Sequence, residues 1–218
     1  MIKLLSWTTP NGRKISIALE EMGLAYEAIA VDITAGEQNT PEFRKINPNG
    51  KIPAIIMPDG RTVMESGAIL FFLGENANQF MPQRGTSAYW QMMEWLMWQA
   101  SGQGPMLGQA HHFLHYNKGK SDYAEERYHA EAIRLYGVLN ERLLGRQHIL
   151  GTMSIVDFAI WPWISRFEWH EVDLNDFPNV REYYVRLADR PAFQRGYAEP
   201  IDVGPIPMPA APKPLRLE

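Results

Sequence analysis

A short segment near the N-terminus combines a hydroxyl, an amide and the expected start of a helix. The residues Thr9, Pro10, Asn11 and Gly12 follow an apolar run at 2–6. A helix N-terminus offers free backbone N–H groups and a partial positive charge, so it favours an anion such as a thiolate. Thr9 and Asn11 can each donate a hydrogen bond to that anion. The alternative is that both side chains only cap the helix.

A second segment contains a proline that could turn the backbone before it outward. Ile52 and Pro53 lie between a polar stretch at 47–51 and an apolar run at 54–57. A cis-proline would turn the Ile52 backbone outward, where its N–H and C=O can pair with a peptide ligand as an added strand would. An ordinary trans turn proline is the alternative, because only about 5–6% of X–Pro bonds in folded proteins are cis.

A third segment, Glu65 and Ser66, joins a carboxylate to a hydroxyl where a strand meets a helix. Glu65 can hold an α-ammonium group, and Ser66 with the helix N-terminus can hold an α-carboxylate. The pair therefore suits the amino-acid end of a ligand. The alternative is a simple helix cap formed by Ser66.

The histidines near the middle of the chain leave their role open. His111 and His115 are four residues apart and would share a helix face, as two ligands of a metal ion do, with His112 beside them. The sequence offers no third ligand, so we expect no metal. We expect instead a polar pocket lining or a hydrogen-bonded core histidine.

The chain of 218 residues contains no cysteine. Disulfide bridges, thiolate metal sites and cysteine nucleophiles are therefore excluded. Any sulfur chemistry must arrive with a ligand.

Composition narrows the partners. The net charge is −4, and lysine and arginine do not cluster as nucleic-acid binding requires. Apolar runs stay shorter than the ~18 residues of a membrane span, and the N-terminal apolar run is too short for a signal peptide. We expect a cytoplasmic protein that binds neither nucleic acid nor membrane.

The elements that must position these residues alternate between strand and helix patterns over residues 1–83. Strands are expected at 2–6, 26–31, 54–57 and 62–64, and helices at 11–22 and 66–76. This β-α-β and β-β-α order is typical of an α/β thioredoxin-like domain, with a small mixed sheet and helices on both faces.

From residue 87 the pattern becomes helical, after a linker over 79–87. Trp90, Trp95 and Met97 belong to a helix that we expect to be heavily buried. Further helices are expected over 123–144 and 178–189, together with one that begins at the capping-box variant Ser154, Ile155, Val156 and Asp157. We therefore predict a thioredoxin-like domain at 1–83, an all-helical domain at 87–199 and a proline-rich tail at 200–218.

The order of these motifs over about residues 1–195 resembles the glutathione transferase family. The stretches at 9–12, 49–55, 98–99, 104–109 and 161–163 are similar to the Nu class, a bacterial class related to yeast prion-type transferase homologues. That resemblance implies the glutathione transferase fold and a two-fold dimer. It also implies disulfide reduction with glutathione as co-substrate and weak activity on the usual aromatic substrates.

The resemblance assigns roles around the glutathione thiol. Thr9 and Asn11 match the residues that face the sulfur, Ile52 matches the backbone partner of the glutathione cysteine, and Pro53 matches the cis-proline. Many transferases activate the thiol with a tyrosine, serine or cysteine in the first loop. Here no tyrosine or cysteine is in that loop, and Ser6 is expected to end a buried strand, so Thr9 and Asn11 are expected to be the catalytic pair.

The resemblance also assigns the two ends of the tripeptide. Glu65 and Ser66 match the residues that hold the γ-glutamyl group, and Gln38 and Lys51 match contacts to the glycine end. Arg134 matches a position that can reach the site of the neighbouring subunit.

Three functions stay open at this point. The first is disulfide reduction, which needs a second glutathione to resolve the mixed disulfide, so the site should hold two glutathiones or one oxidised glutathione. The second is glutathione conjugation, or thioether cleavage, of an electrophilic aromatic substrate. The third is a non-enzymatic glutathione-binding scaffold.

Overall fold

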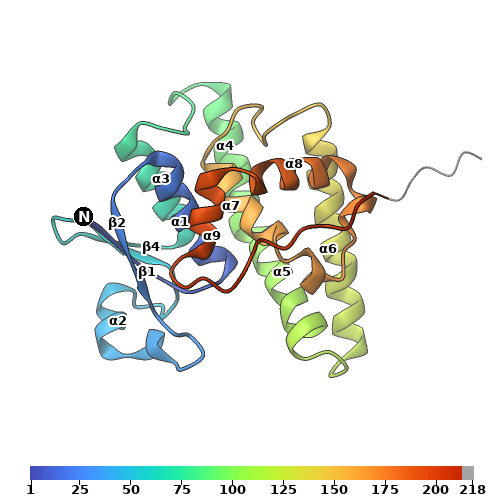
Figure 1. Cartoon of the computed structure of the whole chain (residues 1–218), viewed down its shortest axis with the longest axis horizontal. Helices are drawn as coiled ribbons and strands as arrows, with labels where there is room; N and C mark the ends of the chain where they lie inside the picture. Colours follow the sequence, from blue (N-terminus) through green and yellow to red (C-terminus); the bar gives the residue numbers. More distant parts are fainter. Residues whose placement is uncertain (213–218) are drawn as a thin grey trace, which may run out of the picture.

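The computed structural model describes residues 1–212 of the chain (Figure 1). Its first part is built on a four-stranded sheet with the order β2-β1-β3-β4. β1 pairs in parallel with β2 and antiparallel with β3, and β3 pairs antiparallel with β4, so the expected mixed sheet is confirmed. The strands are β1 (Ile2–Ser6), β2 (Tyr26–Ala30), β3 (Ala54–Ile56) and β4 (Thr62–Met64).

The register of the sheet brings three loops to one edge. Ser6 lies opposite Ala30 in β2, and Leu5 lies opposite Ala54 in β3. The loops that follow β1 and β2 and the loop that precedes β3 therefore leave the sheet side by side. These loops carry most of the residues singled out from the sequence.

Helices cover both faces of the sheet. α1 (Pro10–Met22) and α3 (Ser66–Ala77) share a core with one face, whereas α2 (Pro41–Ile46) covers the other through Phe43, which packs with Leu5. α2 was not predicted from the sequence. Its signals are Thr40, whose Oγ1 accepts from the Phe43 amide at 3.3 Å, and a proline in the first turn.

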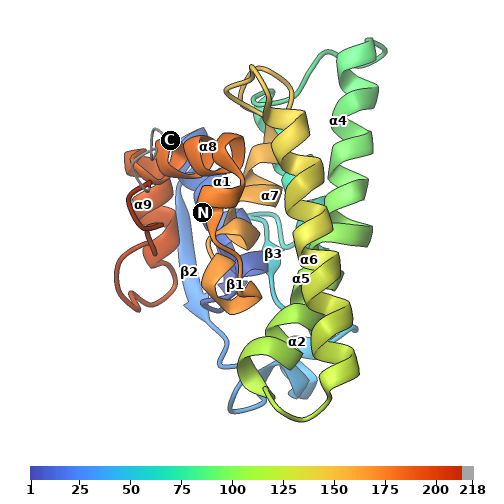
Figure 2. The same ribbon diagram turned by 90° about the vertical axis from the view of Figure 1, so that its right-hand side faces the viewer.

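The rest of the chain is helical, as predicted. Figure 2 shows α4 and α5 forming one long rod beside α6. Two π-helical turns, η2 (Gln99–Gln103) and η3 (His111–Tyr116), flank α5. The α-helices are α4 (Ser87–Trp98), α5 (Gly104–Ala110), α6 (Asp122–Leu143), α7 (Ile155–Ile164), α8 (Pro178–Ala188) and α9 (Pro191–Ala198); the short 3-10 turns are η1 (Glu37–Asn39), η4 (Phe167–His170) and η5 (Leu174–Asp176).

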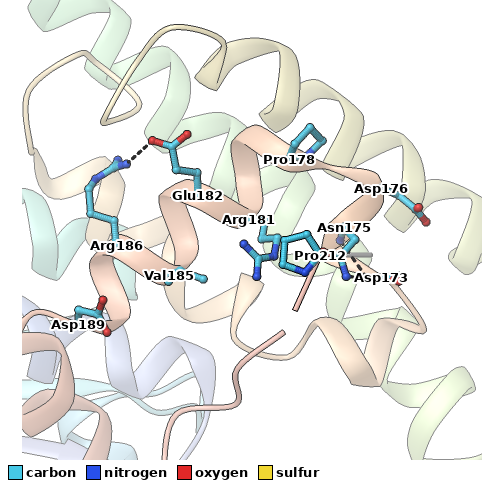
Figure 3. A pocket seen from close by; sticks show the side chains of 10 residues that line it. All are labelled: Asp173, Asn175, Asp176, Pro178, Arg181, Glu182, Val185, Arg186, Asp189 and Pro212. Carbon is cyan, nitrogen blue, oxygen red and sulfur yellow. Dashed lines mark hydrogen bonds and ion pairs between the residues drawn. The ribbon is translucent and has the colours of Figure 1, made fainter. Parts of the chain in front are cut away.

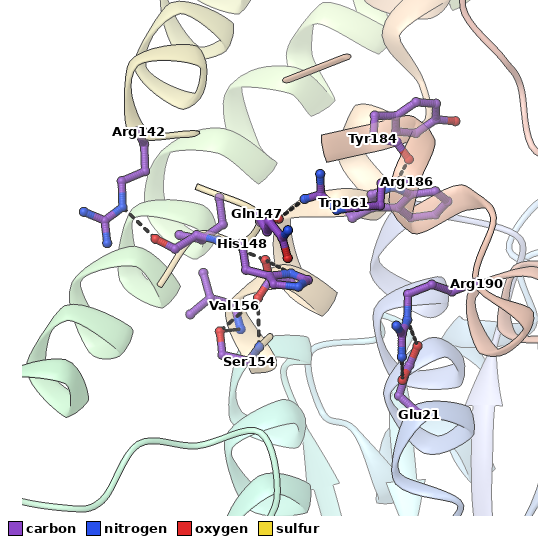
Figure 4. A network of polar contacts seen from close by, with 12 residues as sticks. Glu21, Arg142, Gln147, His148, Ser154, Val156, Trp161, Tyr184, Arg186 and Arg190 are labelled. Atoms are coloured by element: carbon purple, nitrogen blue, oxygen red, sulfur yellow. Dashed lines mark hydrogen bonds and ion pairs between the residues drawn. The ribbon is translucent and has the colours of Figure 1, made fainter. Parts of the chain in front are cut away.

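α7 is buried along its whole length, and its first turn is fixed by the predicted capping box. The Ser154 amide donates to Asp157 Oδ2 at 2.8 Å, and the Ile149 amide donates to Asp157 Oδ1 at 3.1 Å. Figure 4 shows Ser154 in this network, with His148 beside it. The buried carboxylate thus satisfies the start of a helix that solvent does not reach.

The two parts of the chain share one core through α1. Arg13 donates to the Tyr197 carbonyl at 3.1 Å, and Ser16 donates to the Gly196 carbonyl at 2.6 Å, so α9 is joined to α1. A Cβ at Gly196 would lie 2.6 Å from Ile17 Cα, which shows how closely the two helices approach. The helical part therefore fixes the helix whose N-terminus faces the site. The domain boundaries given above remain a prediction.

The expected heavy burial of α4 is wrong for two of its residues. Trp90 is 63% exposed and Met97 is 49% exposed, whereas Tyr89, Met92 and Leu96 face the core. The sequence prediction failed because α4 is apolar around much of its circumference, so periodicity did not reveal which face is buried.

Residues 200–212 contain no helix or strand, as expected for the tail. The Pro207 carbonyl accepts from the Tyr184 hydroxyl at 2.6 Å, which holds this segment against α8. The remainder of the predicted tail, 213–218, lies outside the described residues. Among residues 1–212, no helix is both long and apolar enough to span a membrane.

Candidate functional site

Two cavities meet at the edge of the sheet where the three loops described above lie. The smaller has a volume of about 180 Å³ and includes Glu65, Ser66 and Pro53; the larger has a volume of about 930 Å³ and includes Thr9 and Gln38. Both cavities are lined by Asn11, Lys51 and Ile52. The structure thus gathers eight of the nine predicted site residues, and a ligand that spans the two cavities must pass the start of α1.

The start of α1 leaves few donors free. Thr9 Oγ1 accepts from the Gly12 amide at 3.2 Å, so Thr9 caps the helix as the alternative interpretation held. Pro10 has no backbone N–H. The backbone N–H of Asn11 has no partner among residues 1–212, so it is free to bind a ligand. The Thr9 hydroxyl proton remains available, because the cap uses only the oxygen. Capping and anion binding are therefore compatible here.

The Asn11 side chain is oriented by Trp163 of α7. The Trp163 Nε1–H donates to Asn11 Oδ1 at 3.2 Å. Because an indole nitrogen can only donate, the oxygen of Asn11 must face the indole and its NH₂ group must face away. The NH₂ group itself has no partner among the described residues, so it can donate to a ligand.

The Ile52–Pro53 peptide bond is cis, as the resemblance implied. The β3 ladder begins only at Ala54, so the Ile52 backbone stays outside the sheet and lines both cavities. Asn47 holds the loop in place, since its Nδ2 donates to the Lys51 carbonyl at 2.6 Å. A peptide ligand could pair with Ile52 as predicted.

Glu65 precedes α3 with φ 68° and ψ 117°, a conformation that residues other than glycine rarely adopt. Backbones of this kind occur often at functional sites. The carboxylate is exposed at the smaller cavity, where it can receive an ammonium group.

Ser66 does not cap α3, so the alternative interpretation as a simple helix cap is wrong. The residue before the helix is Glu65, and no side chain among the described residues caps the helix. The Ser66 hydroxyl instead accepts from Lys14 Nζ at 3.1 Å, so its own proton is free to point into the smaller cavity.

Lys14 is a site residue that sequence reasoning missed. It is 2% exposed, and its ammonium group also donates to Gln99 Oε1 of the first π-helical turn at 2.6 Å. Burial lowers the pKa of Lys14 to about 7, against the opposing effect of Glu65. The available signal was its position four residues before Ala18, on the stripe of α1 that the core covers.

Gln38 and Lys51 lie along the larger cavity, as a glycine carboxylate of the ligand would require. Gln38 Nε2 donates to the Ile33 carbonyl at 3.4 Å, and Gln38 Oε1 is buried without a partner among residues 1–212. The assigned contacts remain predictions.

Arg134 is the predicted site residue that the structure does not bring to the cavities. It lies on α6 and forms a bidentate pair with Glu131, with both distances at 2.7 Å. A role of Arg134 in a neighbouring subunit remains a prediction.

Two of the three histidines singled out above line the larger cavity. His111 and His112 line it, whereas His115 stacks on Trp169 with ring centroids 4.2 Å apart. Among residues 1–212, no group of three or more histidine, aspartate or glutamate side chains is placed to hold a metal ion. His111 is both pocket lining and a hydrogen-bonded core residue, which were the two roles favoured above.

A further hollow of about 770 Å³ lies along α8, away from these residues (Figure 3). Charged side chains line much of it, and Arg186 pairs with Glu182 at 3.5 Å. None of the predicted site residues contributes to it. The two joined cavities therefore remain the candidate site.

Comparisons with known proteins place the chain in a family. Residues 8–76 fit the family model described as "Glutathione S-transferase, N-terminal domain". The chain is 44% identical over 199 residues to disulfide-bond oxidoreductase YfcG of Escherichia coli (strain K12). This match covers 88% of this chain and 92% of that protein. It is 35% identical to disulfide-bond oxidoreductase YghU of the same organism, with 94% of this chain and 77% of that protein covered.

Solved structures agree in fold. A glutathione transferase from Burkholderia graminis, with two glutathione molecules bound per subunit, is 41% identical with a TM-score of 0.85 over 91% of this chain and 88% of that chain. A glutathione transferase from Pseudomonas putida, with one glutathione disulfide bound per subunit, is 40% identical with a TM-score of 0.85 over 91% of each chain. The thioredoxin-like sheet, the helical second part and these relatives together show that the chain belongs to the glutathione transferase family.

Proposed function

We propose that the protein is a glutathione-dependent disulfide reductase that acts through the thiolate of bound glutathione. The observation that carries this proposal is the junction of the two cavities at Asn11, Lys51 and Ile52. The γ-glutamyl group would occupy the smaller cavity, and the glutathione sulfur would lie at the junction. The larger cavity, near the upper end of the usual range of about 300–1,000 Å³, then leaves room for the second thiol.

The start of α1 can supply the required activation without a protein base. A thiol with a pKa of about 8.5 is only about 3% thiolate at pH 7, and lowering its pKa by about two units requires about 2.7 kcal/mol. A helix N-terminus contributes up to ~2 kcal/mol, and one hydrogen bond to an anion contributes about 1.5–3 kcal/mol. The Thr9 hydroxyl, the Asn11 amide and the Asn11 side chain are the donors in place for this.

The reaction consumes two glutathiones. The bound thiolate attacks one sulfur of the substrate disulfide, which breaks the S–S bond and releases the other half as a thiolate that takes up a proton. A second glutathione thiolate attacks the glutathione sulfur of the mixed disulfide. Oxidised glutathione and a second reduced thiol result, so both electrons come from the pair of glutathiones. The chain has no cysteine that could replace the second one.

The wall of the larger cavity supports a second candidate, thioether chemistry on an aromatic substrate. Its aromatic residues provide an apolar surface for a ring. They are Trp7, Tyr116, Trp163 and Trp169.

We further propose that the protein works as a two-fold dimer. Trp90 and Met97 lie seven residues apart on α4, hence on one face, and both are largely exposed. Large apolar side chains that gather on one exposed helix face indicate a contact surface.

Parallel assays test the proposed function. Glutathione-dependent turnover of hydroxyethyl disulfide should exceed turnover of an aryl halide by at least about a hundredfold. The reverse order would favour thioether chemistry. Binding of glutathione without turnover of either substrate would favour the scaffold.

A further inference from the structure

Three buried side chains form a hydrogen-bonded chain that ends at the larger cavity. The Tyr136 hydroxyl lies 2.9 Å from His170 Nδ1, and His170 Nε2 lies 2.8 Å from His111 Nε2. The two imidazole rings are nearly parallel, with planes 6° apart and centroids 4.7 Å apart. Tyr136 and His170 are almost fully buried, and His111 is 7% exposed where it lines the cavity.

The buried end of this hydrogen-bonded chain, Tyr136, determines which group donates and which accepts at each step. If His170 donated to Tyr136, the tyrosine proton would need another acceptor, and none exists among residues 1–212. A buried hydroxyl proton without an acceptor is costly. Tyr136 therefore donates to His170 Nδ1, and His170 donates through Nε2 to His111 Nε2. The single N–H of neutral His111 is then on Nδ1, which has no partner among the described residues and is not sealed from solvent.

His111 stays neutral at physiological pH. Burial, and next the charges of Arg166 and His115, lower the pKa of His111 to about 3. The pKa of His170 is lowered by burial first and by His111 second. The hydrogen-bond direction is thus fixed at the pH at which the enzyme would work.

The cavity that receives this N–H favours anions. Its described lining includes the cations Lys51 and Arg166 and neither aspartate nor glutamate, although the whole chain carries a net charge of −4. Arg166 donates to the Thr8 carbonyl at 3.2 Å, and its Nε is buried without a partner among the described residues. Because Lys51 is assigned to the glycine end of the first glutathione, Arg166 is left to face a second ligand.

We propose that Tyr136 and His170 position His111 so that its Nδ1–H, together with Arg166, binds a carboxylate on the half of the disulfide that leaves. This inference rests on the proposed function and names its substrate class: disulfides that carry carboxylates. Cystine and other disulfides of carboxylate-bearing thiols have this chemistry. The half that leaves is not itself glutathione, because one glutathione replacing another gives no net reaction. His111 touches the substrate, whereas Tyr136 and His170 act through it.

Two disulfides of similar size test the proposal. Dithiodipropionate carries carboxylates, and hydroxyethyl disulfide carries hydroxyls. The readout is the ratio of their kcat/KM values. His111→Phe keeps a ring against Trp163 but removes the donor, and this ratio should fall about tenfold. Tyr136→Phe removes only the buried hydroxyl, and the ratio should fall about threefold because His111 loses its fixed tautomer.

Controls separate positioning from general damage. His111→Asn places an amide nitrogen near the position of Nδ1 and should restore part of the ratio. His115→Phe keeps the stack on Trp169 and lies outside the hydrogen-bonded chain, so the ratio should be kept. Nitrogen NMR of the wild-type protein should show His111 protonated on Nδ1, and Tyr136→Phe should give a mixture of tautomers.

Two results would overturn the proposal: equal losses on both disulfides in His111→Phe, or a wild-type His111 that is protonated on Nε2. If the wild-type protein reduced neither disulfide, the proposed function would fail instead. The hydrogen-bonded chain would then be judged by the tautomer measurement.

Discussion

The indole N–H of Trp163 and the amide oxygen of Asn11 lie 3.2 Å apart and join the helical part of the chain to the start of α1. The contact fixes which end of the Asn11 amide faces the ligand. Trp163 also stacks on His111, with ring centroids 5.4 Å apart. One indole therefore contacts a donor proposed for the first glutathione and a donor proposed for the leaving half of the disulfide.

Trp163→Phe should lower kcat/KM for disulfide reduction about fivefold, the equivalent of one hydrogen bond of about 1 kcal/mol. The side-chain amide group of Asn11 would then be free to rotate, and for part of the time its oxygen would face the thiolate. The measurement is steady-state kinetics combined with the ultraviolet absorbance of the bound thiolate. An unchanged pH profile of that absorbance would show that Trp163 does not act through Asn11.

Thr9→Val should raise the pKa of the bound glutathione thiol by about one unit, since about 1.4 kcal/mol of thiolate stabilisation is lost with the hydroxyl. It should also destabilise the fold by about 1 kcal/mol, because Thr9 caps α1. Thr9→Ser is the matched control and should keep both properties. If the serine variant lost as much as the valine variant, the hydroxyl would not be the responsible group.

Much of the N-terminal part was predictable from local signals. Strand β1 has the predicted bounds, and α1 ends at Met22 as predicted, with Gly23 after it at φ 64°. The resemblance predicted which side chains meet, and the register of the sheet explains it, because the ends of β1 and β2 and the start of β3 share one edge of the sheet. Asn11, Lys51 and Ile52, which follow β1 or precede β3, line both cavities at that edge.

Long-range partners were not predictable in the same way. Lys14 contacts Gln99, 85 residues away, and His170 contacts His111, 59 residues away. Such contacts depend on how the helices pack, and periodicity says nothing about which polar groups on two buried stripes will meet. The exposure of Trp90 was missed because α4 is apolar around much of its circumference.

Lys14 should make the stability of the protein depend on pH. Its pKa is about 7 in the folded chain and 10.5 as the unperturbed value, so between these values the unfolded state binds a proton that the folded state does not. The free energy of unfolding should therefore rise with pH from about 7 to about 10.5, by at most about 1.4 kcal/mol per pH unit. Lys14→Met should lack this rise in urea unfolding. Parallel curves for the two proteins would contradict the assignment.

Glu65→Gln should raise the KM for glutathione about tenfold with little change in kcat, because a charged hydrogen bond to the α-ammonium group is lost. The control experiment changes the ligand instead of the protein. A glutathione analogue with a glutaryl group in place of γ-glutamate has no ammonium group, and the wild type and the variant should use it equally well. A difference that persisted with this analogue would assign Glu65 a structural role in the turn before α3.

The exposed face of α4 gives the last prediction. Trp90 is 63% exposed and Met97 is 49% exposed, so a symmetric contact would bury both from each subunit, and a single tryptophan contributes about 150–250 Å². The double variant Trp90→Glu, Met97→Glu should sediment as a monomer where the wild type sediments as a dimer. Tyr123→Glu, at an aromatic position on α6 that is 74% exposed, should leave the dimer intact. A wild-type monomer would refute the assembly, and a dimer that survives the double variant would place its interface elsewhere.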